Sequence, residues 1–267
     1  MDHVEVDGLR VAYQRRGDGP PLVLLHGAVS DSRVWRVELE SFADDYTVVA
    51  WDAPGCGESS DPPEGYGMAD YARCLAGLIE AIDLGPAHLL GHSWGSGLAL
   101  ELAHRRPELV NTLVLVGAYA GWAGSLPPEE IQRRLDFAHQ LADSIPSGFD
   151  PRSMPGLFSD AMPSDRAAEL AGIMSDIRPA GTRIMAEAFA ASDQHDILGS
   201  IDTPALLVYG DQDLRSPVEV GEALHEALSH STLTVLPGLG HVCYLEDAAR
   251  FEEAVRSFLD GHRQRQP

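Results

Sequence analysis

Residues 91–95 read Gly91-His92-Ser93-Trp94-Gly95, directly after the apolar run 87–90 and at the start of a Leu- and Ala-rich segment, 94–104. The run predicts a buried strand and the segment predicts a helix. Glycines on both sides of the serine let the backbone turn sharply between the two, which leaves the Ser93 hydroxyl exposed at the helix N-terminus. A G-x-S-x-G match alone is weak evidence in a chain with 26 glycines, so its surroundings decide its meaning.

Strand-like and helix-like segments alternate on both sides of this turn. Short stretches flanking Asp7-Gly8 predict an antiparallel hairpin. Near-continuous apolar runs predict strands buried on both faces at 22–25, 47–51, 87–90, 112–116, 205–209 and 232–236. Helical spacing predicts helices at 33–42, 68–82, 94–104, 218–228 and 247–259. This order indicates an α/β fold with one mostly parallel, eight-stranded sheet and helices on both faces.

The stretch 120–200 differs from the rest of the chain. It contains no β-like run, and its amphipathic segments are punctuated by prolines such as Pro127-Pro128, Pro163 and Pro179. We interpret it as a helical cap inserted into a core formed by 1–119 and 201–267. A separate helical bundle packed elsewhere is the alternative interpretation.

Acidic and imidazole side chains follow two later strands of the predicted sheet. Gly210-Asp211-Gln212-Asp213 comes after 205–209, and Gly238-Leu239-Gly240-His241 comes after 232–236. The carboxyl ends of parallel strands converge at one edge of a sheet, so these loops are expected to meet Ser93 there. A serine hydroxyl is too weak an acid to be a nucleophile at pH 7. His241 would take its proton, and an aspartate would hold the imidazole in the right tautomer.

With these residues in place, the chain resembles the α/β-hydrolase superfamily over nearly its whole length apart from the cap. The segment starting at His26-Gly27 looks like the family's HGxx turn, and Asp52-Ala-Pro-Gly-Cys-Gly-Glu-Ser59 looks like its D-x-P-G-x-G-x-S loop. The family's G-x-x-D spacing selects Asp213 over Asp211 as the acid.

The resemblance also implies roles for residues near the serine. The backbone N–H groups of Ala28 and Trp94 would form the oxyanion hole. His26 and Gly27 are expected to contact the substrate, although His26 also fits a residue that stabilises the turn. His92 fits a structural or pocket-lining imidazole.

The cap is expected to set the substrate. Its Trp122 is predicted to contact the substrate, and Arg178 or Arg183 could hold a substrate carboxylate. Other large cap residues could line the pocket or fill the core: Phe137, Phe149, Phe158, Met174, Met185 and Phe189.

The identity of the nucleophile limits the classes of reaction that the protein is expected to catalyse. Related haloalkane dehalogenases and epoxide hydrolases carry Asp at this position, whereas Ser93 points to an acyl-enzyme. The turn after strand 22–25 lacks the HGGPG of prolyl iminopeptidases. Val242 follows His241 where hydrolases of meta-cleavage products usually have Trp. We therefore predict hydrolysis of a carboxylic ester or lactone. The alternatives are C–C bond hydrolysis of a vinylogous diketone and a non-catalytic ligand receptor on the same fold.

Composition excludes several other classes. The formal net charge of −22 would repel nucleic acid and anionic lipid surfaces. No secretory signal or membrane-spanning stretch is visible, so we expect a cytoplasmic protein. Cys56, Cys74 and Cys243 fit reduced thiols and have no metal-ligand spacing, so neither a metal nor a cofactor is implied. The expected partner is a small-molecule substrate, and the oligomeric state is left open.

Overall fold

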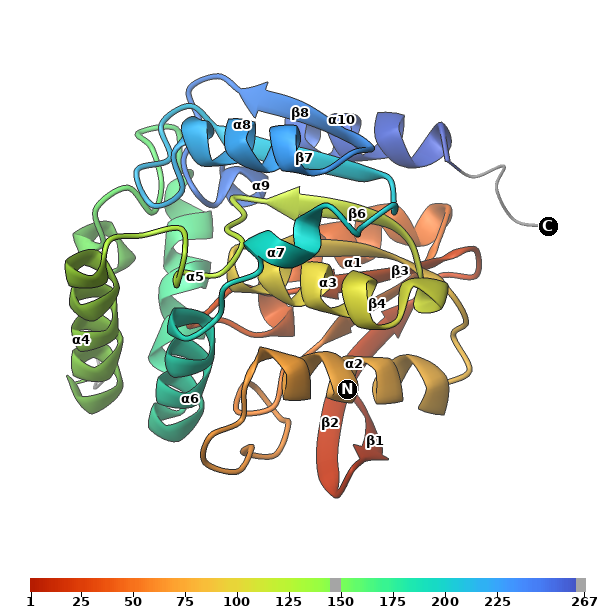
Figure 1. Ribbon diagram of the computed structural model, residues 1–267, viewed down its shortest axis with the longest axis horizontal. Coiled ribbons are helices and arrows are strands. Elements are labelled where there is room, and N and C mark those ends of the chain that lie inside the picture. The colour runs from red at the N-terminus through yellow and green to blue at the C-terminus, as the bar shows by residue number, and fades with distance from the viewer. Residues whose placement is uncertain (145–149, 263–267) are drawn as a thin grey trace.

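The computed structural model describes residues 1–144 and 150–262, within which the strands form one eight-stranded sheet in the order β1-β2-β4-β3-β5-β6-β7-β8 (Figure 1). β2 pairs antiparallel with β1 and β4, and the other neighbours are parallel. The predicted α/β fold is therefore confirmed. The strands are β1 (Asp2–Val6), β2 (Leu9–Arg16), β3 (Pro21–Leu25), β4 (Thr47–Trp51), β5 (Ala87–His92), β6 (Val110–Val116), β7 (Ala205–Gly210) and β8 (Ser231–Leu236).

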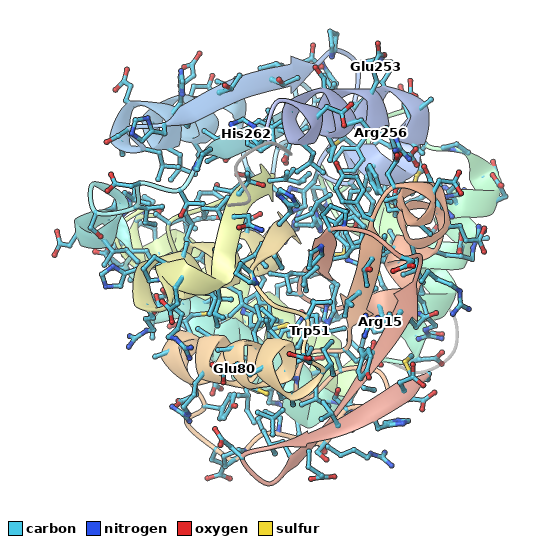
Figure 2. The ribbon with its side chains drawn as sticks, turned by 90° about the vertical axis from the view of Figure 1, so that its right-hand side faces the viewer. Arg15, Trp51, Glu80, Glu253, Arg256 and His262 are labelled. Carbon is cyan, nitrogen blue, oxygen red and sulfur yellow. The ribbon has the colours of Figure 1, made fainter. Side chains whose placement is uncertain are left out.

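Two hydrophobic cores cover the two faces of the sheet. In β3, Val23 and Leu25 face one core, and Leu22 and Leu24 face the other, because successive side chains of a strand point to opposite faces. Figure 2 shows α2, marked by Glu80, and α10, marked by Glu253 and Arg256, on opposite sides of the sheet. The first core includes α2 (Met68–Ala81), α3 (Trp94–Arg105) and α8 (Val218–Ala227); the second includes α1 (Arg36–Ser41) and α10 (Ala248–Asp260).

The helix predicted at 33–42 is broken in the structure. It consists of a 3-10 turn (Ser32–Trp35), α1 (Arg36–Ser41) and a second 3-10 turn (Phe42–Asp44). The break falls at Trp35 (φ −91°, ψ 16°), whose ring is fully buried and stacks on Tyr244 with the ring centroids 4.4 Å apart. Burial of a large side chain here overrides the helical spacing of the sequence.

Between β6 and β7 the described residues form helices and no strand. α4 packs on α6, and Figure 1 shows α4, α5 and α6 together at one end of the molecule, whereas the short α7 lies against α3 and α8. These helices are α4 (Pro128–Ser144), a 3-10 turn (Pro151–Ser153), α5 (Ser164–Ser175), α6 (Pro179–Ala190) and α7 (His195–Leu198). We call α4 to α6 the cap helices.

The loop that resembles D-x-P-G-x-G-x-S holds one cap helix against the core. A Cβ added to Gly181 of α6 would lie 2.0 Å from the carbonyl oxygen of Gly55, which itself has φ +92°. The Arg178 guanidinium, just before α6, donates to the Ser59 carbonyl at 2.5 Å and pairs with Asp61 at 3.3 Å. Two glycines and one arginine therefore fix the start of α6 on this loop.

Within the ranges 1–144 and 150–262, no helix combines the length and apolar character that a membrane crossing requires.

Candidate active site

Ser93 occupies a strained turn between β5 and α3. Its backbone has φ 53° and ψ −113°, a conformation that costs a non-glycine residue on the order of 1–3 kcal/mol. The Ser93 N–H donates to the Val116 carbonyl at 2.8 Å. A Cβ added at Gly91 would lie 2.4 Å from the Gly95 carbonyl oxygen. A Cβ added at Gly95 would lie 2.3 Å from the Leu25 carbonyl oxygen. Both glycines are therefore required by packing, and together they hold the serine at the start of α3.

His241 and Asp213 form a buried pair. The His241 Nδ1 and the Asp213 Oδ2 lie 2.7 Å apart, with side chains 5% and 1% exposed. An ionised carboxylate only accepts, so Nδ1 carries the proton and Nε2 is left as the basic nitrogen. The other carboxylate oxygen accepts the N–H groups of Arg215 and Ser216, each at 2.8 Å. Asp213 is thereby fixed by its own loop, with one oxygen directed at the imidazole.

The neighbouring acid, Asp211, has a different position. It is exposed, and its Oδ1 accepts the N–H of Gly238 at 2.6 Å. Asp211 therefore ties the loop after β7 to the loop after β8, and Asp213 is the acid paired with His241.

Gly117 makes room for this pair and was missed by the sequence analysis. Its φ is +54°, and a Cβ added there would lie 2.9 Å from His241 Nδ1 and 3.4 Å from Asp213 Oδ2. The signal in the sequence was a glycine directly after the strand 112–116, where no carboxylate follows.

Of the residues predicted at the turn after β3, some line the cavity that contains Ser93 and others do not. Ala28 lines the same cavity as Ser93, Trp94 and His241. Trp94 is the first residue of α3, where a backbone N–H has no carbonyl one turn earlier to bind. Val29 also lines the cavity and has φ 56°, an outlier for a β-branched residue. The two predicted oxyanion residues thus reach one cavity with the nucleophile candidate.

His26 and Gly27, expected to contact the substrate, are not among the residues that line this cavity. The His26 ring is fully buried; its Nε2 accepts the Ala53 N–H at 3.0 Å, and its Nδ1 donates to the Gly27 carbonyl at 2.8 Å. Both ring nitrogens are occupied, so His26 stabilises the turn. A Cβ on Gly27 would lie 2.7 Å from His92 Nδ1.

His92 supports the backbone of His241. Its Nε2 donates to the His241 carbonyl at 3.1 Å, and its Nδ1 accepts from the Tyr244 hydroxyl at 3.4 Å. Burial, reinforced by the nearby His241, holds the pKa of His92 well below its usual value. His92 is therefore a neutral imidazole that lines the cavity and braces the loop carrying His241.

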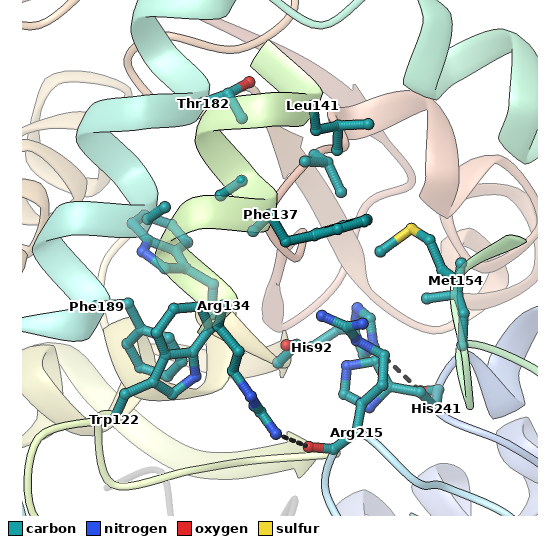
Figure 3. Close-up of a pocket in the computed structure, with 17 residues that line it drawn as sticks. His92, Trp122, Arg134, Phe137, Leu141, Met154, Thr182, Phe189, Arg215 and His241 are labelled. Atoms are coloured by element: carbon teal, nitrogen blue, oxygen red, sulfur yellow. Dashed lines mark hydrogen bonds between the residues drawn. The ribbon is translucent and has the colours of Figure 1, made fainter. Parts of the chain in front are cut away.

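The cavity lies between the sheet edge and the cap helices (Figure 3). Its volume is about 90 Å³, measured as the space open to the centre of a water-sized sphere. One water needs roughly 10–15 Å³ by this measure, so a small organic group fits. From the cap segment, it is lined by Trp122, Arg134, Phe137, Ala138, Leu141, Met154, Leu157, Thr182, Ala186 and Phe189.

The cap predictions divide accordingly. Trp122, Phe137 and Phe189 line the cavity, whereas Phe158, Met174 and Met185 do not. Phe149 lies outside the described residues.

The arginines at the cavity are not the predicted ones. Arg178 binds the loop before α2, and Arg183 pairs with Asp143. Arg134 and Arg215 line the cavity instead. Neither carries a local sequence signal, because both reach the cavity through tertiary packing.

Cys243, close to His241 in sequence, is a buried thiol whose pKa is raised by burial. Among the described residues, no three or more His, Cys, Asp or Glu side chains gather in a way that could hold a metal ion.

Comparisons with known proteins place this chain in a family. A model of the alpha/beta hydrolase fold matches residues 20–156. The chain is 30% identical over 259 residues to the putative carbamate hydrolase RutD of Pseudomonas syringae, covering 92% of this chain and 95% of that protein. It is also 30% identical over 267 residues to the 2-hydroxymuconate semialdehyde hydrolase of a Pseudomonas species, covering 94% and 91%.

Among solved structures, a malate-bound thermophilic esterase from Thermogutta terrifontis superposes with a TM-score of 0.89 at 25% identity, covering 98% of this chain and 100% of that one. The strained serine turn, the sheet order and the family match agree with one another, and the chain belongs to the α/β-hydrolase family.

Proposed function

We propose that the protein is a serine hydrolase that cleaves a carboxylic ester or lactone through an acyl-Ser93 intermediate. The observation that carries this proposal is the buried His241–Asp213 contact of 2.7 Å at the cavity that Ser93 also lines. The similarity to the esterase from Thermogutta terrifontis supports the ester class.

The reaction would run in two steps. His241 Nε2 takes the proton of the Ser93 hydroxyl as its oxygen attacks the substrate carbonyl, and the oxyanion is bound by the N–H groups of Ala28 and Trp94. The tetrahedral intermediate collapses to the acyl-serine, and His241 gives its proton to the leaving alcohol oxygen. Water then attacks the acyl-serine with His241 as base, which releases the acid and restores Ser93. Asp213 stays ionised throughout and stabilises the imidazolium.

The test is p-nitrophenyl acetate turnover together with fluorophosphonate labelling detected by intact mass. The wild type is expected to turn over the ester and gain one label, and Ser93→Ala and His241→Ala are expected to lose both properties. Ser175→Ala, an exposed serine of α5, is the matched control. A folded wild type that neither labels nor turns over would reject the hydrolase and favour a ligand receptor.

A second candidate is hydrolysis of a C–C bond in a vinylogous diketone. It is favoured by the 30% identity to the 2-hydroxymuconate semialdehyde hydrolase. The two are separated by product analysis: loss of the diketone chromophore at a kcat/KM above that for esters would put the C–C reaction first.

A further inference from the structure

The cavity around Ser93 carries a charge opposite to that of the whole protein. Among the described residues that line it, Arg134 and Arg215 are charged and none is Asp or Glu. The chain as a whole has a formal net charge of −22. The partners of each arginine decide whether the protein itself neutralises this positive charge.

Arg134 of α4 already has its partners. Its Nε binds Glu130 at 2.7 Å, and its Nη2 donates to the Arg215 carbonyl at 3.1 Å. Its guanidinium also lies over the rings of Tyr119 and Trp122, at 5.4 and 5.5 Å from their centroids. Arg133 and then Arg134 hold the pKa of Glu130 at about 2, so that carboxylate is ionised and is shared between the two guanidinium groups.

The Arg215 guanidinium has no hydrogen bond or ion pair with any described residue, although its backbone is held tightly. Its N–H donates to Asp213 at 2.8 Å, and its carbonyl accepts from the Tyr119 hydroxyl at 2.9 Å and from Arg134. Asp213 is already occupied, one oxygen by His241 and the other by two backbone N–H groups. Figure 3 shows the Arg215 side chain directed into the cavity beside His241.

The Arg215 side chain is half-buried. Burial, with the nearby Arg134, lowers the pKa of Arg215 from its usual value, yet arginine stays protonated in proteins. A half-buried cation inside a cavity that gains no anion from the described residues is suited to an anion that arrives with the substrate.

Building on the proposed ester or lactone hydrolysis, we propose that Arg215 binds a carboxylate group of the substrate and makes the enzyme selective for anionic esters or lactones. The planar guanidinium fork matches a carboxylate with two parallel hydrogen bonds. One free guanidinium balances one negative charge, which suits a carboxylate better than a phosphate dianion. Arg134 and Tyr119 act as positioning residues, because both donate to the Arg215 carbonyl.

The experiment uses matched ester pairs that differ in one charge. One pair is 3-acetoxybenzoate and its methyl ester, with the carboxylate on the alcohol side. The other is monophenyl adipate and methyl phenyl adipate, with the carboxylate on the acyl side. For at least one pair, wild-type kcat/KM is expected to favour the anionic member. Arg215→Gln is expected to reduce that ratio roughly 10- to 100-fold, the range for losing hydrogen bonds to a charged group. Arg215→Lys is expected to restore part of it.

Arg133→Gln is the matched control, because Arg133 is one residue from Arg134, is 70% exposed and does not line the cavity. It removes the same charge and is expected to keep the wild-type ratio. A wild type without preference in either pair, or a preference that survives in Arg215→Gln, would overturn the role of Arg215 and leave the ester hydrolase standing.

If no ester is turned over, the proposed function fails, and glutarate binding followed by calorimetry then decides on Arg215 alone. Binding that is at least 10-fold weaker in Arg215→Gln than in Arg133→Gln would support the anion site. Equal glutarate binding by the two variants, or no glutarate binding by the wild type, would reject the anion site.

Discussion

The loops after β5, β7 and β8 hold their cavity residues differently from the cap helices. In the loops, each of these hydrogen bonds involves a main-chain group: the Ser93 N–H donates to the Val116 carbonyl, the Asp213 carboxylate accepts two N–H groups of its own loop, and the His241 carbonyl accepts from the His92 ring. In the cap, Phe137 and Thr182 reach the cavity from α4 and α6, which pack on each other. The loops therefore fix the groups that we propose to react, whereas side-chain packing of helices shapes the part of the cavity that we propose selects the substrate.

The largest effect on activity is expected in the loops, from a substitution at Asp213. Asp213→Asn keeps the shape but can present an amide N–H to His241, which favours the wrong tautomer, so kcat/KM should fall on the order of 10⁴-fold. Asp211→Asn, two residues away, keeps an oxygen to accept the Gly238 N–H and should stay within a few-fold of wild type. Steady-state ester kinetics on both variants make the measurement. Equal losses in the two variants would contradict the assignment of the acid.

A smaller loss of activity is expected when the space beside the His241–Asp213 pair is filled. In Gly117→Ala the new methyl would lie 2.9 Å from the His241 ring, and the residue would keep φ +54°. We expect a loss on the order of 100-fold in kcat/KM, because misplacing a catalytic group by about 1 Å has an effect of that size. Stability should fall by about 1 kcal/mol or more in urea unfolding. Activity within threefold of wild type would show that the pair does not depend on this glycine.

A stability effect with a defined pH dependence is expected at Glu38 in α1. Its carboxylate is fully buried, neither oxygen has a hydrogen-bond partner in the described structure, and burial raises its pKa to about 8. The unfolded chain releases this proton near pH 4.5, so native stability falls between about pH 4.5 and pH 8 and then levels off.

Glu38→Gln removes this titration and should be more stable than wild type at pH 8.5 by on the order of a few kcal/mol. At pH 4 this gain should be absent. Urea unfolding at both pH values makes the measurement, and a gain that is equal at the two would contradict a protonated native Glu38.

The smallest effect is expected in the cap, at Gly172 within α5. A Cβ added there meets nothing within 4 Å. Gly172→Ala should raise the free energy of unfolding by about 0.5–1 kcal/mol, because alanine is the better helix former. Ester kinetics should be unchanged. If Gly172→Ala is less stable than wild type, the space around each glycine does not explain why substitutions at Gly172 and Gly117 differ in effect.

The sheet was predicted from the sequence, and the loop residues were singled out there, because both carry local signals. A glycine on each side of Ser93 and an apolar run before it are visible within ten residues. The spacing of Asp213 after β7 is equally local. The roles assigned to Ser93, His241 and Asp213 stay a proposal until kinetics test them.

What could not be predicted depends on contacts between distant residues. His26 was expected at the substrate, yet its ring binds Ala53, 27 residues away, and is buried in the turn. Arg215 was not singled out, because its place in the cavity and the occupation of the nearby Asp213 by other groups both depend on the folded structure. The break at Trp35 follows from stacking on Tyr244, which no local pattern encodes.

The most direct test is to find the acyl group. Wild-type protein mixed with phenyl acetate and quenched in acid within milliseconds should carry one acetyl group, about 42 Da, on the peptide that contains Ser93. His241→Ala and Ser93→Ala should carry none. An acetyl group on another residue, or ester turnover in Ser93→Ala at the wild-type rate, would contradict the acyl-serine mechanism.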